Sequence, residues 1–480
     1  MDPVAVAALK RRIVRRGLVI ASLALTAPWT SHAQILQLWS HSAPRGDASG
    51  AVALGDTLML VVNNEDQFLR LYSRYPGTAC PAPIYALNVS PVLALTGSDL
   101  TADLESCAAR TDSTGTTIYS LGSLGNSATG NLRPNRSRVF ATRVEGDGTG
   151  SPPYTFTYLG RYDWLRDDIL AWDANNLHGL GANYFGLGES AASGVSPKLV
   201  NGFNVEGLAF SADGKVAYVG FRTPFVNGSG PTTGASPRTY ALLIPVLNLP
   251  SLVTGNPTLG PGTAQFGTPI VLPLGSRGIR SIDRISTGEF LITAGPADAV
   301  SNPPVAPLDF RVFLWSGHPL SPPVELATTF GATESPEACL PPVGPLTSSS
   351  AAQFINDDGS STCWRSMTCP IGSAVSPADV PRPQPGPGAA RFTRPPTPSP
   401  ARHRVSFAFE LPEAGWVDVA IVDVAGRRIA TMWRGLLERG DHAYSWAGES
   451  DTANPPAAGV YWVSVRTPDA IQSRAFVWRP

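Results

Sequence analysis

Residues 204–220 read NVEGLAFSADGKVAYVG, and this stretch indicates the fold of most of the chain. A short apolar run is followed by a turn at Asp213 and Gly214, and then by a second run rich in Val and Tyr, which is the pattern of a β-hairpin. Related stretches recur at 47–62, 103–121, 278–295 and, in an interrupted copy, 335–359. The chain therefore contains at least five related hairpins.

Repeated units of roughly 40–50 residues with several short strands each are typical of a β-propeller. The longest interval between aligned copies, 101 residues from Glu105 to Glu206, contains two more strand-like stretches, at 138–144 and 154–159, and is long enough for a further unit. We therefore expect an all-β chain with a five- or six-bladed, propeller-like body. A stack of β-sandwiches or a β-helix is the alternative, although the repeats are long and irregular for a β-helix. One short helix is expected at 161–170, where apolar residues recur at helical spacing.

The order of charge and apolarity predicts four segments. Residues 1–33 have the pattern of a secretory signal peptide: a basic start, an apolar run from Gly17 to Ala27, and a small-residue cleavage site. The body follows at 34–375, and a Pro-rich linker at 376–402. Alternating apolar residues then predict a small β-sandwich of seven strands at 403–480. We expect a secreted or cell-surface protein with no transmembrane anchor after cleavage of the signal.

The overall charge argues against one class of partner. Lys and Arg number 36 and Asp and Glu 37, so the net charge is −1. Such a chain has no general electrostatic attraction to a polyanion, and we expect no nucleic-acid partner. The partner that we expect is a small ligand or a component of the cell envelope, of unknown identity.

The five cysteines suggest disulfides, because an exported chain meets an oxidising compartment. Closeness in the sequence favours Cys80 with Cys107, and Cys339 with Cys363 or Cys369. Buried free thiols are the alternative for any one of them. The odd count leaves at least one thiol unpaired within the chain.

The tail carries LPEAG, DVAGR, GDHAYSW and AGVY in this order, between residues 411 and 461. In this it resembles the immunoglobulin-like module of FlgD-type hook-capping proteins and of C-terminal sorting domains of type IX secretion. The resemblance implies a small Ig-like sandwich with a spacer, attachment or sorting role. Where those sorting domains carry an Asn-Pro box, this chain reads RPPTP at 394–398.

Several stretches of the body, among them LGRYDWLRDDILAWD at 159–173, GIRSID at 278–283 and LITAGPAD at 291–298, occur in a consistent order. In these it resembles a bacterial family of exported proteins whose domain has no known function. The EGLAFSADG stretch at 206–214 is also similar to phytase-like and esterase-like propellers. That second resemblance implies a metal-dependent hydrolase that uses carboxylates of the central channel.

A polar ring is the leading candidate for a binding site. When the hairpins are aligned on their third residue, that position holds Ser49, Glu105, Glu206, Arg280 and Glu337. If it faces a central channel, Glu105, Glu206, Arg280 and Glu337 form a ring that could orient a ligand, and the three glutamates could bind Ca²⁺, which prefers oxygen ligands. Otherwise each glutamate caps backbone amides in its own repeat. No other cofactor is expected.

A second candidate set lies just after the strands, where loops often carry function. It consists of Glu65, Asp66, Arg222, Asp357 and Asp358. Asn and Asp are also ordinary turn residues, so a structural role is the alternative. Of the histidines in the region that resembles the exported family, His178 is the one candidate for a general base.

These observations favour a binding protein over an enzyme, because the sequence contains no motif of a nucleophile elbow, a zinc-protease helix or a phosphate-binding loop. The competing hypotheses are a metal-dependent phytase-like or esterase-like hydrolase and a purely structural display protein.

Overall fold

The computed structural model describes residues 35–479, apart from 44–46, 77–78, 229, 235, 254–258, 299–304, 320, 332, 358, 360–361, 373–389, 424–426, 452–454 and 468–470. The predicted signal peptide at 1–33 lies outside the described residues. Within the described ranges, none of the helices combines the length and apolarity that a membrane span requires.

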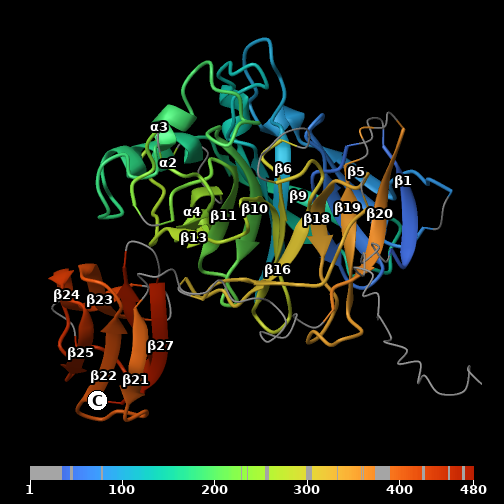
Figure 1. The fold of residues 1–480 in the computed structure, drawn as a ribbon. Coiled ribbons are helices and arrows are strands. Elements are labelled where there is room, and N and C mark those ends of the chain that lie inside the picture. Colours follow the sequence, from blue (N-terminus) through green and yellow to red (C-terminus); the bar gives the residue numbers. More distant parts are fainter. Residues whose placement is uncertain are drawn as a thin grey trace, which may run out of the picture. The chain divides into compact units, whose positions relative to one another are not determined.

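The body is built from five antiparallel sheets of four strands each (Figure 1). The first sheet contains β2 (Gly50–Leu54), β3 (Leu58–Val62), β4 (Phe68–Ser73) and β5 (Tyr85–Asn88). The second contains β6 (Leu104–Asp112), β7 (Gly115–Gly122), β8 (Val139–Glu145) and β9 (Thr155–Tyr162). The third contains β10 (Asn204–Phe210), β11 (Ala217–Thr223), β12 (Ala241–Val246) and β13 (Ile270–Leu272). The fourth contains β14 (Gly278–Arg284), β15 (Phe290–Gly295), β16 (Arg311–Trp315) and β17 (Val324–Glu325).

The fifth sheet joins the two ends of the body. Its strands β18 (Pro336–Leu340), β19 (Ala351–Asn356) and β20 (Cys363–Pro370) follow one another in the chain, and its outer strand is β1 (Gln37–Ser42), from the start of the described chain. Strand β1 pairs along its whole length with β20. The beginning and the end of the body are therefore held in one sheet by backbone hydrogen bonds.

All five predicted hairpins are confirmed, because each consists of the first and second strands of one sheet. The interval from Glu105 to Glu206 holds no further sheet in the described part of the chain. Its two strand-like stretches are β8 and β9, the outer strands of the second sheet. The rest of the interval contains α2 (Leu165–Ala174) and α3 (Leu187–Ser190). The helix predicted at 161–170 is α2, which begins later because Arg161 and Tyr162 complete β9.

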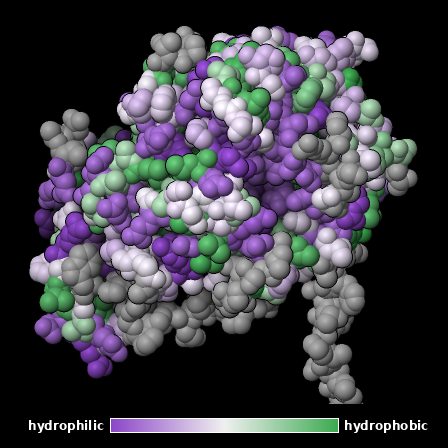
Figure 2. All heavy atoms as spheres, turned by 90° about the horizontal axis from the view of Figure 1, so that it is seen from above, coloured by the Kyte–Doolittle hydropathy of each residue, from purple (hydrophilic) through white to green (hydrophobic). Residues whose placement is uncertain are grey.

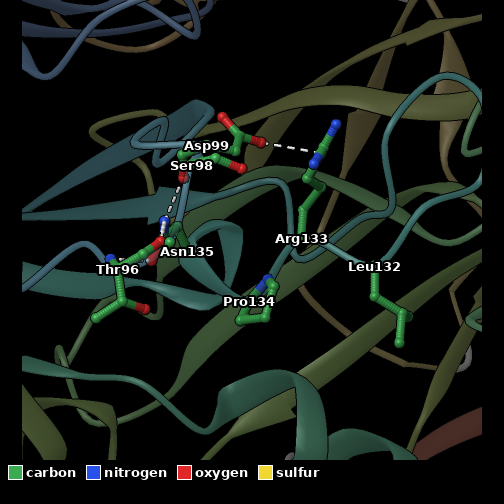
Figure 3. Close-up of a pocket in the computed structure, with 8 residues that line it drawn as sticks. Thr96, Ser98, Asp99, Leu132, Arg133, Pro134 and Asn135 are labelled. Atoms are coloured by element: carbon green, nitrogen blue, oxygen red, sulfur yellow. Dashed lines mark hydrogen bonds and ion pairs between the residues drawn. The ribbon is translucent and has the colours of Figure 1, made fainter.

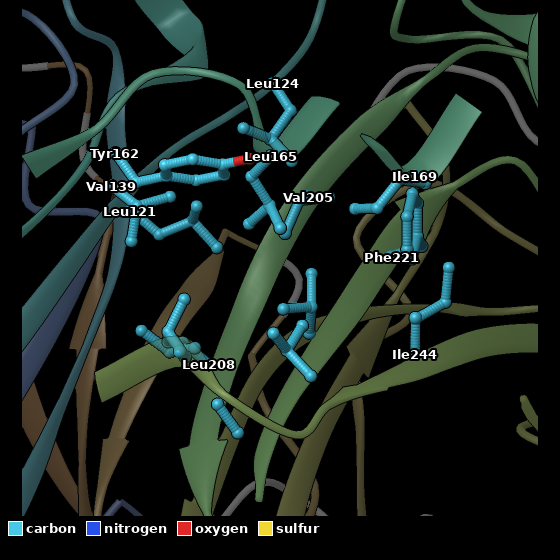
Figure 4. Close-up of a cluster of buried hydrophobic side chains, with 14 of the residues drawn as sticks. Leu121, Leu124, Val139, Tyr162, Leu165, Ile169, Val205, Leu208, Phe221 and Ile244 are labelled. Atoms are coloured by element: carbon cyan, nitrogen blue, oxygen red, sulfur yellow. The ribbon is translucent and has the colours of Figure 1, made fainter. Parts of the chain in front are cut away.

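The first strands contact one another in a succession that returns to its start: β2 with β6, β6 with β10, β10 with β14, β14 with β18, and β18 with β2. A buried apolar cluster fills each of the five contacts between neighbouring sheets. Figure 4 shows the cluster between the second and third sheets, where Leu121 and Val139 face Val205 and Leu208. Burial of apolar surface between sheets, at about 25 cal/mol per Å², is the main force that holds this succession together.

The disulfide prediction was wrong in its pairing. Cys80, after β4, is bonded to Cys363, the first residue of β20, and so links the first sheet to the fifth. Cys107 and Cys339, which were expected to take part in disulfides, are buried free thiols, as is Cys369. Closeness in the sequence misled the prediction, because Cys80 and Cys363 are 283 residues apart and meet only when the first and fifth sheets are neighbours.

The tail forms two antiparallel sheets around one apolar core. The three-stranded sheet contains β21 (Arg391–Thr397), β22 (Val405–Leu411) and β25 (Gly440–Trp446). The four-stranded sheet contains β23 (Gly415–Val422), β24 (Arg428–Leu437), β26 (Gly459–Arg466) and β27 (Ile471–Trp478). Seven strands were expected at 403–480, and six lie there. The seventh, β21, lies inside the stretch 376–402 that was assigned to the linker. Its prolines are compatible with this position because β21 is an edge strand, where fewer backbone donors are needed.

Candidate functional site

The four charged residues of the predicted ring share one local backbone feature. In β6, β10, β14 and β18, pairing with the next strand skips the aligned position, so Glu105, Glu206, Arg280 and Glu337 each lie at a break in register. Such a β-bulge redirects the side chain of the extra residue. In β2 the pairing continues without a break, and the aligned Ser49 lies just before the strand. The bulge is thus repeated in the four sheets whose aligned residue is charged.

Arg280 joins three sheets at this site. Its Nη1 donates to Glu206 Oε2 at 3.1 Å, and to Glu337 Oε1 and Oε2 at 2.9 and 3.1 Å. Its Nη2 donates to the carbonyl oxygen of Pro296 at 3.2 Å, and the guanidinium lies over the ring of Phe310. The side chain is 2% exposed. The structure therefore brings Glu206, Arg280 and Glu337 together as one buried ionic network.

Glu206 has the most complete set of partners. Arg222, on β11, donates through Nη1 to Glu206 Oε1 at 2.8 Å, and Asn204 Nδ2 donates to the same oxygen at 3.0 Å. Arg280 binds the other oxygen. Burial opposes ionisation of Glu206, but the guanidinium groups of Arg222 and Arg280 outweigh it and hold its pKa below the ordinary value. Glu206 is therefore a carboxylate at neutral pH.

Glu105 and Glu337 behave in the opposite way. Burial raises the pKa of Glu337 to about 8, against the attraction of Arg280 and with added repulsion from Glu206. Burial also raises the pKa of Glu105 well above its usual range, and the repulsion of Asp103, Glu206 and Glu337 adds to the effect. Among the described residues, the carboxyl group of Glu105 forms no hydrogen bond and no ion pair, although the charges of this group act on its pKa. It is half-buried.

The expected Ca²⁺ site at Glu105, Glu206 and Glu337 finds no support. Within the described ranges, no group of three or more His, Cys, Asp or Glu side chains is arranged to hold a metal ion. The physical reason is that guanidinium groups already occupy oxygens of Glu206 and Glu337. A divalent cation would have to displace Arg280, or share these oxygens with it against charge repulsion.

The second predicted set lies partly beside the ring. Arg222 belongs to the network, as described, and Asp357 and Glu65 are close enough to raise the pKa of Glu337 and of Asp103, respectively. Asp66 is instead paired with Arg70 of its own sheet at 2.6 Å, and its carboxylate also accepts the backbone N–H of Phe68. Asp358 lies outside the described residues.

Sequence reasoning missed the residues two positions before the bulge. Asp103 precedes Glu105 and pairs with Arg136 at 2.7 Å, and Asn204 precedes Glu206 and binds it. Both begin their hairpin copies in the aligned sequence, and the other copies begin with Asp47, Gly278 and Ser335. The recurrence of small or polar residues at this first position is the signal that would have identified them.

A further carboxyl group follows the ring residue on β14. Burial raises the pKa of Asp283 to about 8, although the nearby side chain of Ser281 and the backbone of Cys339 oppose the shift. Its Oδ2 is buried without a hydrogen-bond partner. Asp283 also raises the pKa of the buried Cys107 thiol on β6. Three of the first strands therefore surround a carboxyl group that is mainly protonated at neutral pH.

His178 does not have the setting of a general base. Its ring lies in the loop after α2, where Nε2 is 3.2 Å from Asp173 Oδ1 and Nδ1 accepts the N–H of Leu180. Neither side chain of the pair is exposed. Asp173 also accepts the backbone N–H groups of Phe185 and Leu187. The pair fixes this loop to α3 and presents no reactive atom to solvent.

A pocket of about 260 Å³ lies apart from the ring residues, between the segments 96–99 and 132–135 (Figure 3). Its polar groups are used internally: Arg133 pairs with Asp99 at 2.9 Å, and Asn135 exchanges hydrogen bonds with the backbone of Thr96. Figure 2 shows a face on which hydrophilic residues predominate and hydrophobic residues form small, separate patches. That face offers no broad apolar surface, which leaves the polar ring as the stronger candidate.

Comparison with known proteins leaves the family open. No family model and no curated protein matches the chain. Among solved structures it is similar to PorZ, a surface component of the type IX secretion system of Porphyromonas gingivalis, with 13% identity and a TM-score of 0.23 over 93% of this chain and 52% of PorZ. The chain thus spans about half the length of PorZ. It is also similar to a glucose dehydrogenase, with 12% identity and a TM-score of 0.29 over 70% of this chain and 98% of that one. Both scores are too low to carry an argument, and the resemblances to the FlgD-type, sorting-domain and phytase-like families stay predictions.

Proposed function

We propose that this chain is an exported binding protein whose body is a five-bladed β-propeller with a ligand site at the polar ring. The five four-stranded sheets and the circular succession of contacts between their first strands support the propeller. In this architecture the first strand of each sheet lines a central channel. Ligands commonly bind at the mouth of such a channel, where polar groups from several blades converge.

One observation carries the proposal. Four β-bulges, in four sheets, direct charged side chains into a single group, although Glu206 and Arg280 are 74 residues apart and Arg280 and Glu337 are 57 apart. Burying such a network is expensive, and well-packed apolar residues often give equal or greater stability at such positions. A repeated backbone irregularity with charged groups is therefore better explained by a binding role than by stability.

A binding role agrees with the chemistry of the group better than catalysis does. The metal-dependent hydrolase alternative needs a metal site, and the described residues offer no arrangement for one. The site combines a carboxylate, Glu206, with Glu337, which is mainly protonated at neutral pH, and with Glu105, whose pKa burial raises well above its usual range. A protonated carboxyl group has both a hydrogen-bond donor and an acceptor for a polar ligand.

Export is proposed on the signal-like sequence at 1–33 together with the Cys80–Cys363 disulfide, because such bonds persist in oxidising compartments. For the tail we propose an Ig-like module that acts as a spacer, attachment or sorting domain. Its two-sheet architecture supports the module type.

The test is a thermal-shift screen of the full exported chain against probes of distinct chemistry: putrescine, 1,4-butanediol, sucrose, acetate and inorganic phosphate. At least one probe should raise the melting temperature of the wild type. Glu337→Gln, which keeps the size of the side chain, should remove that shift while retaining the native circular dichroism spectrum. Glu145→Gln, an exposed glutamate at the end of β8, is the matched control and should bind normally.

If no probe shifts the wild type, or if Glu337→Gln responds like the wild type, the ring is not the binding site. If Glu337→Gln changes only stability, and all probe responses remain, the structural display hypothesis replaces binding.

A further inference from the structure

Among the described residues, the ring region contains more carboxyl groups than guanidinium groups. The carboxyl groups that act on one another there include Asp103, Glu105, Glu206, Glu337 and Asp357. The guanidinium groups that pair with them are Arg136, Arg222 and Arg280. If all were ionised, the region would carry an excess of negative charge. A positively charged ligand would relieve the repulsion, and an anion would add to it.

The internal cations are distributed unevenly among these carboxyl groups. Arg222 and Arg280 bind Glu206, Arg280 binds Glu337, and Arg136 binds Asp103. Glu105 is the ring residue to which the described part of the chain gives no ion pair and no hydrogen bond. The charged groups that face it are Asp103 and its neighbours across the ring: Glu206, Glu337, Arg222 and Arg280. Three of these repel a carboxylate at Glu105, so its negative charge is the one left uncompensated.

A second acceptor on the neighbouring first strand also lacks a partner. Asn204 is 6% exposed, and its Oδ1 is buried with no hydrogen bond, although its Nδ2 donates to Glu206. A buried amide oxygen without a donor costs about 1–3 kcal/mol, so its presence calls for an explanation. A Cβ added at Gly125 would lie 3.5 Å from this oxygen.

Asn204 lies on the side of the ring where Glu105 is. The backbone N–H of Val205 donates to the carbonyl oxygen of Ser123 at 2.9 Å, and the backbone N–H of Ser123 in turn donates to the carbonyl oxygen of Asp103 at 2.9 Å. Asp103 leads directly into β6 and Glu105. The carboxyl group of Glu105 and the Asn204 amide oxygen are thus acceptors without donors on two adjacent first strands.

We propose that the ring takes a small organic cation with a primary ammonium group, which Glu105 binds as a carboxylate and Asn204 binds through its amide oxygen. This inference rests on the proposed function and names the class of its ligand. An ammonium group has three N–H donors and no acceptor, so it satisfies both orphan acceptors at once. A metal ion fits less well, because it needs more oxygen ligands than are left unoccupied.

Binding of an ammonium group should change the protonation of Glu105. In the absence of ligand, burial and the neighbouring carboxyl groups raise the pKa of Glu105 well above the usual range and so favour its acid form. An ammonium group beside it favours the carboxylate. Binding should therefore release one proton from Glu105 to the buffer, while the ligand keeps its own protons.

The experiment is isothermal titration calorimetry of the full exported chain at pH 7 with putrescine as the probe, in two buffers of different ionisation enthalpy, PIPES and ACES. 1,4-Butanediol, which has the same length without charge, and inorganic phosphate are titrated as controls. We expect putrescine to bind and the diol not to bind. The difference in heat between the two buffers should correspond to about one proton released per ligand. Glu105→Gln should weaken binding at least tenfold and abolish the proton release, whereas Glu145→Gln should change neither.

The outcomes separate this inference from the proposed function. If Glu337→Gln abolishes binding of the diol or of phosphate but putrescine does not bind, the ring is a binding site and the cation is wrong. If putrescine binds equally well to Glu105→Gln, or binds without proton release, the role of Glu105 is wrong. If none of these probes binds, both proposals fail for these ligand classes. Circular dichroism and the melting temperature of Glu105→Gln should match or exceed those of the wild type, because the substitution removes a carboxyl group whose ionisation the folded state opposes.

Discussion

Replacing Arg280 by Met tests whether the ionic network joins the sheets of the body. The side chain is 2% exposed and makes three contacts of 2.9–3.1 Å with two carboxylates from other sheets. Met fills a similar volume but leaves Glu337 without a cation, while Glu206 keeps Arg222 at 2.8 Å. Removal of one partner from a buried ion pair costs about 3–5 kcal/mol. We expect about 3 kcal/mol, the lower end, because Glu206 retains its second guanidinium.

The assay is urea unfolding at pH 8, followed by tryptophan fluorescence and by hydrogen exchange of peptides that cover β10 and β14. The free energy of unfolding comes from the midpoint and slope of the transition. In the Arg280→Met background, adding Glu337→Gln should recover part of the loss, because Gln removes the cost of burying Glu337 without a guanidinium, whether as an unpaired charge or as an acid that takes up a proton at pH 8. The control is Lys215→Met, at an exposed hairpin turn, which should have no measurable effect. A loss for Arg280→Met as small as that of the control would refute the reasoning.

Three more predictions follow from the structure. First, Asp283 has a pKa of about 8 in the folded state and near 4 when unfolded, so between these pH values it holds a proton only in the folded state. The free energy of unfolding should therefore fall as the pH rises from about 4 to 8. Asp283→Asn should flatten this slope, and an unchanged pH profile would contradict the assignment. Second, the double substitution of Cys80 and Cys363 by Ser should lower the free energy of unfolding by at most about 5 kcal/mol, because a loop of nearly 300 residues is no longer closed in the unfolded chain. Reduction of the wild type should give the same loss. Unaltered urea midpoints would show that the bond does not constrain the chain. Third, Gly207→Ala should lower the free energy of unfolding by about 1–3 kcal/mol, because the new Cβ would lie 2.9 Å from Ile279 Cγ2 across the contact between the third and fourth sheets. A melting temperature equal to that of the wild type would mean that the sheets adjust freely.

The positions of the strands could be predicted from the sequence because the information is local. Alternation of apolar and polar residues sets strand faces, and Gly and Asp residues set the turns, as at Asp213 and Gly214. All five hairpins and the strands of the tail other than β21 follow from this pattern. The error at β21 has the same origin, because proline content indicates an extended chain and does not tell whether that chain pairs at a sheet edge.

The candidate site could be predicted only as a set of aligned residues. Alignment of the repeats identified Glu105, Glu206, Arg280 and Glu337, since equivalent positions in similar units face equivalent places. The expected Ca²⁺ site stays a prediction, and the alignment carries no information on which carboxyl groups Arg280 and Arg222 bind. Such pairing depends on distances of about 3 Å between side chains.

The sequence by itself thus determined the strands, the turns and the repeat that places charged residues at one position of each hairpin. Only the tertiary structure decided that Arg280 binds two glutamates, that Glu105 is left without a cation, and that Cys80 meets Cys363. The reason is the range of the interactions. Hairpins form from residues that are neighbours in the chain, whereas these partners are separated by 57 to 283 residues and meet only when the first strands of all five sheets come together.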